Sequence, residues 1–192
     1  ERFKYRLSRH PITLALGYVT VFIGGMCLAP TLRAPLRHVD GVIALVLHAA
    51  IYVAVILTLG WTAALFAILL PFGIASALGA YLFYAQHNFP DVELLSTKDG
   101  WTYEGAALRS SSYFHMGPLM RYFTANIGFH HVHHLNPKIP FYRLPEAFRA
   151  IPELATPKTT SFNPIEVIRC LRLGVWDANA QRLVPLRTAM RR

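Results

Sequence analysis

Charged residues and cysteine are both scarce in this sequence. Of its 192 residues, only 15% are Asp, Glu, Lys or Arg, and 54% are hydrophobic, whereas a soluble domain has about 25% charged residues. This shortage argues against a soluble globular domain. The two cysteines, Cys27 and Cys170, have no CxxC or CxxH spacing around them, so the sequence gives no indication of a disulfide framework or of a cysteine-ligated zinc site.

Charge is missing altogether from two long stretches, residues 10–32 and residues 41–90. A membrane-spanning helix needs about 20 apolar residues, so the longer stretch predicts two such helices within residues 41–86. We expect them at about 41–59 and 61–84, joined by a very short turn at Gly60. Backbone groups in hydrocarbon must be satisfied within the segment, which favours helices over strands. Pro71 is expected to kink the second helix.

The shorter stretch predicts a different kind of membrane segment. Residues 12–29 are long enough to cross a bilayer, but basic residues flank them on both sides. Because Lys and Arg favour the cytoplasmic side, both ends cannot be cytoplasmic if the segment crosses once. We therefore interpret residues 12–29 as a re-entrant or interfacial segment that follows a basic cytoplasmic linker, residues 1–11.

The remainder is predicted to be cytoplasmic, with a folded region at 87–150 and a basic C-terminal tail at 151–192. Asn163-Pro164 indicates the start of a short helix through Leu173. The predicted fold class is thus an all-α integral membrane protein, with a transmembrane helical hairpin, a re-entrant or interfacial segment and a cytoplasmic helical cap. The net charge of +9 lies outside the uncharged stretches, which fits contact with anionic lipid headgroups rather than with nucleic acid.

Four of the nine histidines fall within five positions, in the string FHHVHHL at 129–135. At about 100° per residue, His130, His133 and His134 share an arc of about 100° on a helix, and Asn126 falls inside the same arc. Three imidazoles on one face favour a bound transition metal, with iron, copper and zinc as the alternatives. His131 points about 60° outside this arc, so we expect it to pack or to support the ligands.

Two further histidines lie in or beside the apolar stretch. His87 follows the second predicted spanning helix, where it can reach the interfacial plane of the histidine cluster. We interpret His87 as a candidate metal ligand. His48 lies within the first predicted spanning helix, and a hydrogen bond to a neighbouring helix is the expected state of a neutral histidine there.

Three strings in the sequence resemble the membrane fatty acid desaturase family, and in particular its bacterial acyl-lipid, delta-12-like branch. They are YAQHNFP at 84–90, AALRSSSY at 106–113 and NIGFHHVHHLNPKIP at 126–140. The resemblance extends from about Tyr5 to Phe148, and its most specific part is the third histidine box. It implies that His130, His133 and His134 are iron ligands, and that His87 takes the place of an additional ligand that the family has after its last spanning helix.

The resemblance also implies a cofactor, a reaction and partners. The cofactor is a centre of two non-haem iron ions bound by histidines from three boxes, with O2 as co-substrate. The reaction removes two hydrogens from a fatty acyl chain, on the cytoplasmic face of a multi-pass protein of the bacterial inner membrane. Electrons would come from a carrier such as ferredoxin or cytochrome b5, which would dock on the basic face around Lys138, Arg143 and Arg149.

The sequence departs from the family pattern because the first box, HxxxH, and the second box, another HxxHH, are both absent. We expect them to precede residue 1, so this carboxy-terminal portion would be inactive alone. Related di-iron hydroxylases or ketolases of alkanes, sphingolipids or carotenoids stay open, as does a non-enzymatic membrane metal-binding protein. The outer ring nitrogens of the histidines need partners, and the nearest carboxylates in sequence are Asp91, Glu93, Asp99 and Glu104.

Overall fold

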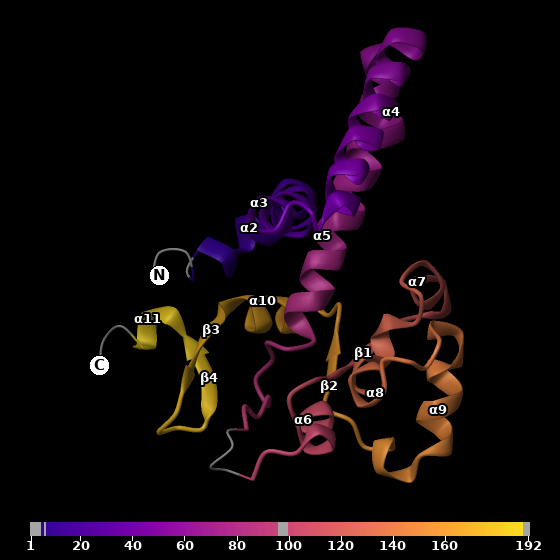
Figure 1. Ribbon diagram of the computed structural model, residues 1–192. Helices are drawn as coiled ribbons and strands as arrows, with labels where there is room; N and C mark the ends of the chain where they lie inside the picture. Colours follow the sequence, from indigo (N-terminus) through magenta and orange to yellow (C-terminus); the bar gives the residue numbers. More distant parts are fainter. Residues whose placement is uncertain (1–4, 6, 96–99, 190–192) are drawn as a thin grey trace. The chain divides into compact units, whose positions relative to one another are not determined.

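Helices make up most of the chain (Figure 1). A computed structural model describes residues 5, 7–95 and 100–189. Much of the predicted basic linker, the end of the tail and the candidate carboxylate Asp99 lie outside these residues. The chain divides into two units, Glu1–Tyr81 and Leu82–Arg192.

All the regular elements of the first unit's described residues are helical. They are α2 (Pro11–Ala15), the π-helical η1 (Tyr18–Leu28), α3 (Ala29–Arg33), α4 (Val39–Ala64), the π-helical η2 (Leu65–Leu69) and the first part of α5 (Leu70–Ala85). Within the described part of the chain, Val39–Ala85 is the one helical run that is long and apolar enough to cross a membrane, judged by length and composition. The helical run Tyr18–Arg33 is apolar but shorter.

The long helical run reverses direction at Gly60. The backbone there has φ 84° and ψ 170°, a conformation that glycine adopts far more readily than other residues. The rings of His48 and Phe72, each twelve positions from Gly60, have centroids 5.1 Å apart. One straight helix would separate these positions by about 36 Å, at about 1.5 Å per residue. The helical stretches before and after Gly60 therefore lie against each other at this level.

Pro71 is accommodated without a break in the helix. A proline ring collides with the carbonyl group four residues earlier in a regular α-helix. Here the π-helical turn η2 comes just before the proline, and α5 begins at Leu70. A wider turn of this kind is one of the recognised ways in which a helix absorbs a proline.

Polar groups of the first unit meet between its helices. The hydroxyl group of Tyr18 in η1 lies within hydrogen-bonding distance of Nε2 of His48 in α4 and donates to the hydroxyl group of Tyr52 at 3.3 Å. The expected hydrogen bond from His48 to a neighbouring helix is thus confirmed. Gly17 brings its segment close to α5, because a Cβ atom at this position would lie 2.6 Å from the carbonyl oxygen of Ser76.

Replacing Gly17 with alanine is expected to destabilise the first unit by about 1–3 kcal/mol, the usual cost of overpacking. The new methyl group would collide with backbone atoms of α5, which cannot move aside as a flexible side chain can. Thermal unfolding in detergent micelles measures the effect. Gly79→Ala is the matched control, since nothing lies within 4 Å of a Cβ atom there and alanine is the better helix former. Equal losses in the two variants would contradict a close approach at Gly17.

The second unit combines short helices with two small sheets. Its elements after α5 are α6 (Tyr103–Arg109), β1 (Tyr113–His115), α7 (Pro118–Phe123), η4 (Ile127–Phe129), α8 (His130–Leu135), η5 (Phe141–Arg143), α9 (Leu144–Ala150), η6 (Pro152–Leu154), β2 (Thr159–Ser161), α10 (Pro164–Arg172), β3 (Leu173–Asp177), β4 (Arg182–Pro185) and α11 (Leu186–Ala189). Strands β1 and β2 pair in parallel, and β3 and β4 form an antiparallel pair. The four strands found in the described residues are additions to the predicted all-α fold, and at three to five residues each they are too short for periodicity to indicate.

The core of the second unit lies behind the histidine box. Phe129, Val132, Leu144 and Leu154 are buried together, and Phe148 packs against them. Two of these residues belong to η4 and α8, so burial of their apolar side chains holds the histidine segment in place. The helix predicted after Asn163-Pro164 is confirmed as α10. The Asn163 side chain caps this helix by accepting a hydrogen bond from the backbone N–H of Ile165 at 2.9 Å.

Cys170 in α10 is fully buried, and burial raises the pKa of its thiol to about 11. At about pH 8 only about one thiol in a thousand is then ionised, and thiolate is the reactive form. We expect iodoacetamide to modify Cys170 at least about 100-fold more slowly in the folded protein than in urea, as measured by mass spectrometry of its peptide. Because the unfolded thiol loses its proton first, the free energy of unfolding should also fall as the pH rises from about 9 to 11. Rapid labelling of the folded protein would contradict this placement.

Candidate metal centre

His87 lies two residues beyond the end of α5, between two buried amide side chains. Nε2 of Gln86 donates to the carbonyl oxygen of Ile127 at 2.8 Å. Nδ2 of Asn88 donates to the carbonyl oxygens of Cys170 and Leu173, at 3.1 and 2.9 Å. These bonds attach the His87 segment to the turn before the histidine helix on one side and to the end of α10 on the other.

His130 and His134 lie one turn apart on α8. Residues four positions apart share one face of a helix, so both imidazoles project on the same side. Val132 projects away from them into the core. Phe129, immediately before the helix, is buried in the same core, which leaves the histidine face of α8 directed at His87.

The Nε2 atoms of His87, His130 and His134 form a compact triangle. The distances are 2.9 Å between His87 and His130, 3.2 Å between His87 and His134, and 3.0 Å between His130 and His134. Imidazole nitrogens bind a metal ion at about 2.0–2.1 Å, and two such bonds at a right angle separate the nitrogens by about 3 Å. The triangle therefore has the size of three adjacent ligands around one ion.

The protonation states also suit a metal ion, which binds neutral imidazole. Burial, with smaller contributions from the neighbouring histidines, lowers the pKa of His130 to about 2 and that of His134 to about 4. Burial also lowers the pKa of His87. Nδ1 of His87 lies 3.3 Å from the carbonyl oxygen of Ser110, and a carbonyl oxygen only accepts. The proton of neutral His87 is therefore on Nδ1. Its Nε2 atom then has a free lone pair, which is directed toward Nε2 of His130 and of His134.

The structure brings three of the four predicted ligands together. His133 lies beside the triangle, with its ring centroid 6.0 Å from the rings of both His130 and His134, but its nitrogens are not part of the three-histidine group. His131 faces the core, where its ring contacts those of Tyr113 and Phe148. Within the described part of the chain, neither of its ring nitrogens has a hydrogen-bond partner.

The predicted helical register does not reach Asn126. This residue has a left-handed backbone, with φ 57°, and precedes the 3-10 turn η4 that leads into α8. Its side-chain amide donates to the carbonyl oxygen of Phe141 at 3.2 Å. The helix was predicted to be continuous from 126 to 134, but it begins at His130, so Asn126 supports the neighbouring turn instead of lying over the histidine face.

A backbone carbonyl, that of Ser110, orients His87, and not one of the four carboxylates that lie nearest in sequence. Of those four, Glu93 forms ion pairs with Lys158 at 2.7 Å and Arg109 at 3.5 Å, and its own carbonyl oxygen accepts a hydrogen bond from Oγ of Ser110. Glu93 thus fixes the turn that presents the Ser110 carbonyl to His87. A backbone acceptor has no sequence signal, whereas the polar string of Gln86 and Asn88 around His87 could have identified the two supporting amides.

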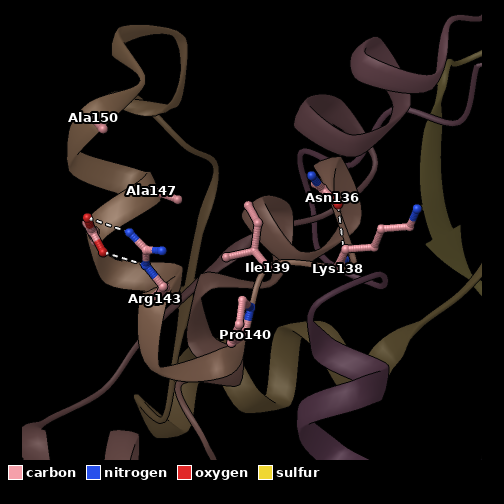
Figure 2. A pocket seen from close by; sticks show the side chains of 8 residues that line it. Asn136, Lys138, Ile139, Pro140, Arg143, Ala147 and Ala150 are labelled. Atoms are coloured by element: carbon pink, nitrogen blue, oxygen red, sulfur yellow. Dashed lines mark hydrogen bonds and ion pairs between the residues drawn. The ribbon is translucent and has the colours of Figure 1, made fainter.

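An open cavity of about 320 Å³ lies just beyond the histidine helix, between the turn after α8 and the helix α9 (Figure 2). Its lining is Asn136, Lys138, Ile139, Pro140, Arg143, Glu146, Ala147 and Ala150. Figure 2 shows the Arg143 guanidinium paired with a carboxylate, that of Glu146, at 2.9 and 3.1 Å. This pairing offsets the charge of Arg143 and leaves Lys138 as the basic group of the opposite wall.

Comparison with known proteins identifies the family of this chain. The model of the fatty acid desaturase family matches residues 2–165, a range that contains His87 and the whole histidine box. A fatty acid desaturase of Bacillus subtilis (strain 168) is 30% identical over 187 residues, which are 97% of this chain and 52% of the relative. The chain thus spans about half the length of that curated relative. The match to the family model over most of the sequence shows that this chain belongs to the fatty acid desaturase family.

Proposed function

We propose that the chain is the carboxy-terminal part of an O2-dependent fatty acyl desaturase, and that His87, His130 and His134 bind one of its two non-haem iron ions. The observation that carries this proposal is the triangle of Nε2 atoms 2.9–3.2 Å apart in a chain of the desaturase family. Three neutral imidazoles are a donor set that suits iron. Bound iron would supply the oxidising power that no side chain has.

The second iron ion would take His133 together with ligands from the rest of the protein. His133 lies next to the triangle but is not part of it, which leaves its imidazole available to a neighbouring ion. Since the relative is about twice as long as this chain, the missing HxxxH and HxxHH boxes have room in the remaining half. The chain would then hold one ion by itself and share the other.

The protein's own groups would position the metal. The Ser110 carbonyl and the buried amides of Gln86 and Asn88 hold His87 in place. In the proposed reaction, one acyl –CH2–CH2– unit becomes –CH=CH–, and O2 takes up its two hydrogens together with two electrons and two protons to form two water molecules. The two electrons would come from ferredoxin, cytochrome b5 or a similar carrier that docks around Lys138 beside the cavity.

The proposed location is a bilayer, with the apolar run Val39–Ala85 inserted and the second unit on the cytoplasmic face. The length and composition of this run support insertion. The basic residues outside the uncharged stretches support a cytoplasmic position for the second unit under the positive-inside rule. Residues 12–29 would then be the re-entrant or interfacial segment.

Expression of the complete protein in a host that lacks desaturases tests the proposal. We expect two iron ions per protein molecule and a new double bond in the membrane acyl chains, identified by mass spectrometry. The position of that bond would decide whether the enzyme belongs to the delta-12-like branch. A hydroxyl or keto product would instead indicate the related oxygenases, and zinc without iron would contradict the proposal.

A further inference from the structure

The helix α7 presents its large apolar side chains to the outside and its charged side chain to the inside. Leu119, Tyr122 and Phe123 are 70%, 81% and 72% exposed, and their spacing of three and four residues places them on one face of the helix. This is the reverse of the usual pattern, in which the apolar face of a helix is turned to the core.

Arg121 lies on the inner side of α7, where its guanidinium group contacts two aromatic residues. One of its guanidinium nitrogens, Nη2, donates to the hydroxyl group of Tyr113 at 2.8 Å, and the guanidinium carbon lies 5.3 Å from the centre of the Phe129 ring. Its Nε atom is buried and has no hydrogen-bond partner among the residues that the structure describes. The fold thus turns a partly buried cation to the inner side of this helix while three large apolar side chains stay outside, which indicates that the outer face of α7 is covered in the working protein.

A second group of exposed rings belongs to the neighbouring turn. Phe141 and Tyr142 in η5 are 56% and 66% exposed. Asn126, three residues beyond α7, donates to the carbonyl oxygen of Phe141 and so ties the two segments together. We define the outer patch as Leu119, Tyr122, Phe123, Phe141 and Tyr142.

Charge and chain connectivity indicate what covers the outer patch. From Pro118 to Ala150 the chain has four basic residues and one acidic residue. Arg121 points inward and Arg143 pairs with Glu146, so the charges of Lys138 and Arg149 are the ones that favour anionic headgroups. Tyrosine and phenylalanine with nearby basic groups are typical of the membrane interface. The apolar helix α5 ends at Ala85, so the second unit is tethered directly to the end of the proposed membrane-inserted run.

We propose that the outer patch lies in the headgroup region of the bilayer and holds the second unit against the membrane surface. The patch is remote in sequence from the inserted run, so it would provide a second, independent membrane contact. A second contact fixes the orientation of the metal centre relative to the lipid from which an acyl chain must come. This inference rests on the membrane insertion put forward above.

Spin labels in vesicles of phosphatidylcholine and phosphatidylglycerol test the proposal. A nitroxide is attached to the complete protein at Tyr122→Cys, at Asn179→Cys on the exposed turn between β3 and β4, or at Leu57→Cys in the inserted run. The native Cys27 and Cys170 are buried, and unmodified protein gives the labelling background. Collision with O2, which concentrates in lipid, is compared with collision with a water-soluble nickel chelate.

The expected result is a ratio of O2 to nickel collisions at position 122 several-fold above that at position 179 and approaching that at position 57. A ratio at 122 equal to that at 179 would mean that the patch faces water, and would overturn the proposal. Weak collision with both reagents at 122 would mean that protein covers the patch, and would overturn it as well. A water-like ratio at 57 would refute the insertion of the apolar run, and the membrane contact with it.

Discussion

With His130 replaced by alanine, the purified chain is expected to lose its metal ion, whereas with His133 replaced it is expected to keep it. Nε2 of His130 lies about 3 Å from both other nitrogens of the triangle, while His133 is not part of the three-histidine group. Even partners of metal ligands are worth about 10–100-fold in affinity, so loss of a ligand should weaken binding by more than about 100-fold. Titration with Co²⁺ as a spectroscopic probe measures this in the chain alone.

The same two variants should behave differently in the complete enzyme. There, both are expected to abolish desaturation, because His133 would then serve the second ion. His131→Phe is the matched control within the box, since this side chain lies among aromatic rings and its nitrogens have no hydrogen-bond partner in the described residues. It should retain metal and activity. Equal loss of Co²⁺ from His130→Ala and His133→Ala in the isolated chain would contradict the division of the four histidines between two ions.

Replacing Gln86 with methionine is expected to lower both the stability of the second unit and its affinity for metal. Methionine has a similar size but cannot donate to the carbonyl oxygen of Ile127, which would lose its partner at a cost of about 1–2 kcal/mol. That bond also sets the distance between the His87 segment and the turn before His130. A decrease in Co²⁺ affinity of about 10–100-fold is the expected consequence.

Gln181→Met is the control for this prediction. Gln181 makes the same kind of bond, to the carbonyl oxygen of Ala178 at 2.8 Å, but it lies on an exposed turn. Its replacement should change the free energy of unfolding by less than about 0.5 kcal/mol and leave metal affinity unchanged. If Gln86→Met lowers the melting temperature while Co²⁺ affinity stays the same, Gln86 stabilises the fold but does not position the site.

Helical spacing in the sequence predicted part of the histidine site but not all of it. His130 and His134 could be paired from sequence because four residues make about one turn of any α-helix. Asn126 could not be placed by the same count, since its left-handed backbone ends the register four residues before the helix begins. Helical spacing also placed His133 in the same group. In the structure the adjacent side chains of His133 and His134 point in different directions, and only His134 joins the triangle.

The contacts between segments far apart in the chain could not be predicted from the sequence. Gly60 was readable as a turn because it lies near the middle of an uncharged stretch too long for one helix. The bond between Gln86 and Ile127 and the Ser110 carbonyl beside His87 depend on which segments the fold brings together. No local pattern records such contacts, and a backbone acceptor belongs to every residue type.

The segment beyond residue 165 also contributes to the site, although the family model ends there. The carbonyl oxygen of Leu173 accepts hydrogen bonds from Tyr84 at 2.5 Å and from Asn88 at 2.9 Å. These two residues lie on either side of His87. The C-terminal residues therefore support the candidate metal centre from outside the part of the chain that the family model matches.

The parallel pairing of β1 with β2 bears on when the proposed metal centre would form. Tyr113 pairs with Thr159, 46 positions later, and the histidine helix lies between them. Pairing over such a separation is slow, because the loop must close before the contacts form. During synthesis the histidines leave the ribosome before β2 does, and units of this kind fold only when complete. Capture of the metal ion is therefore expected late, after the C-terminal residues have been made.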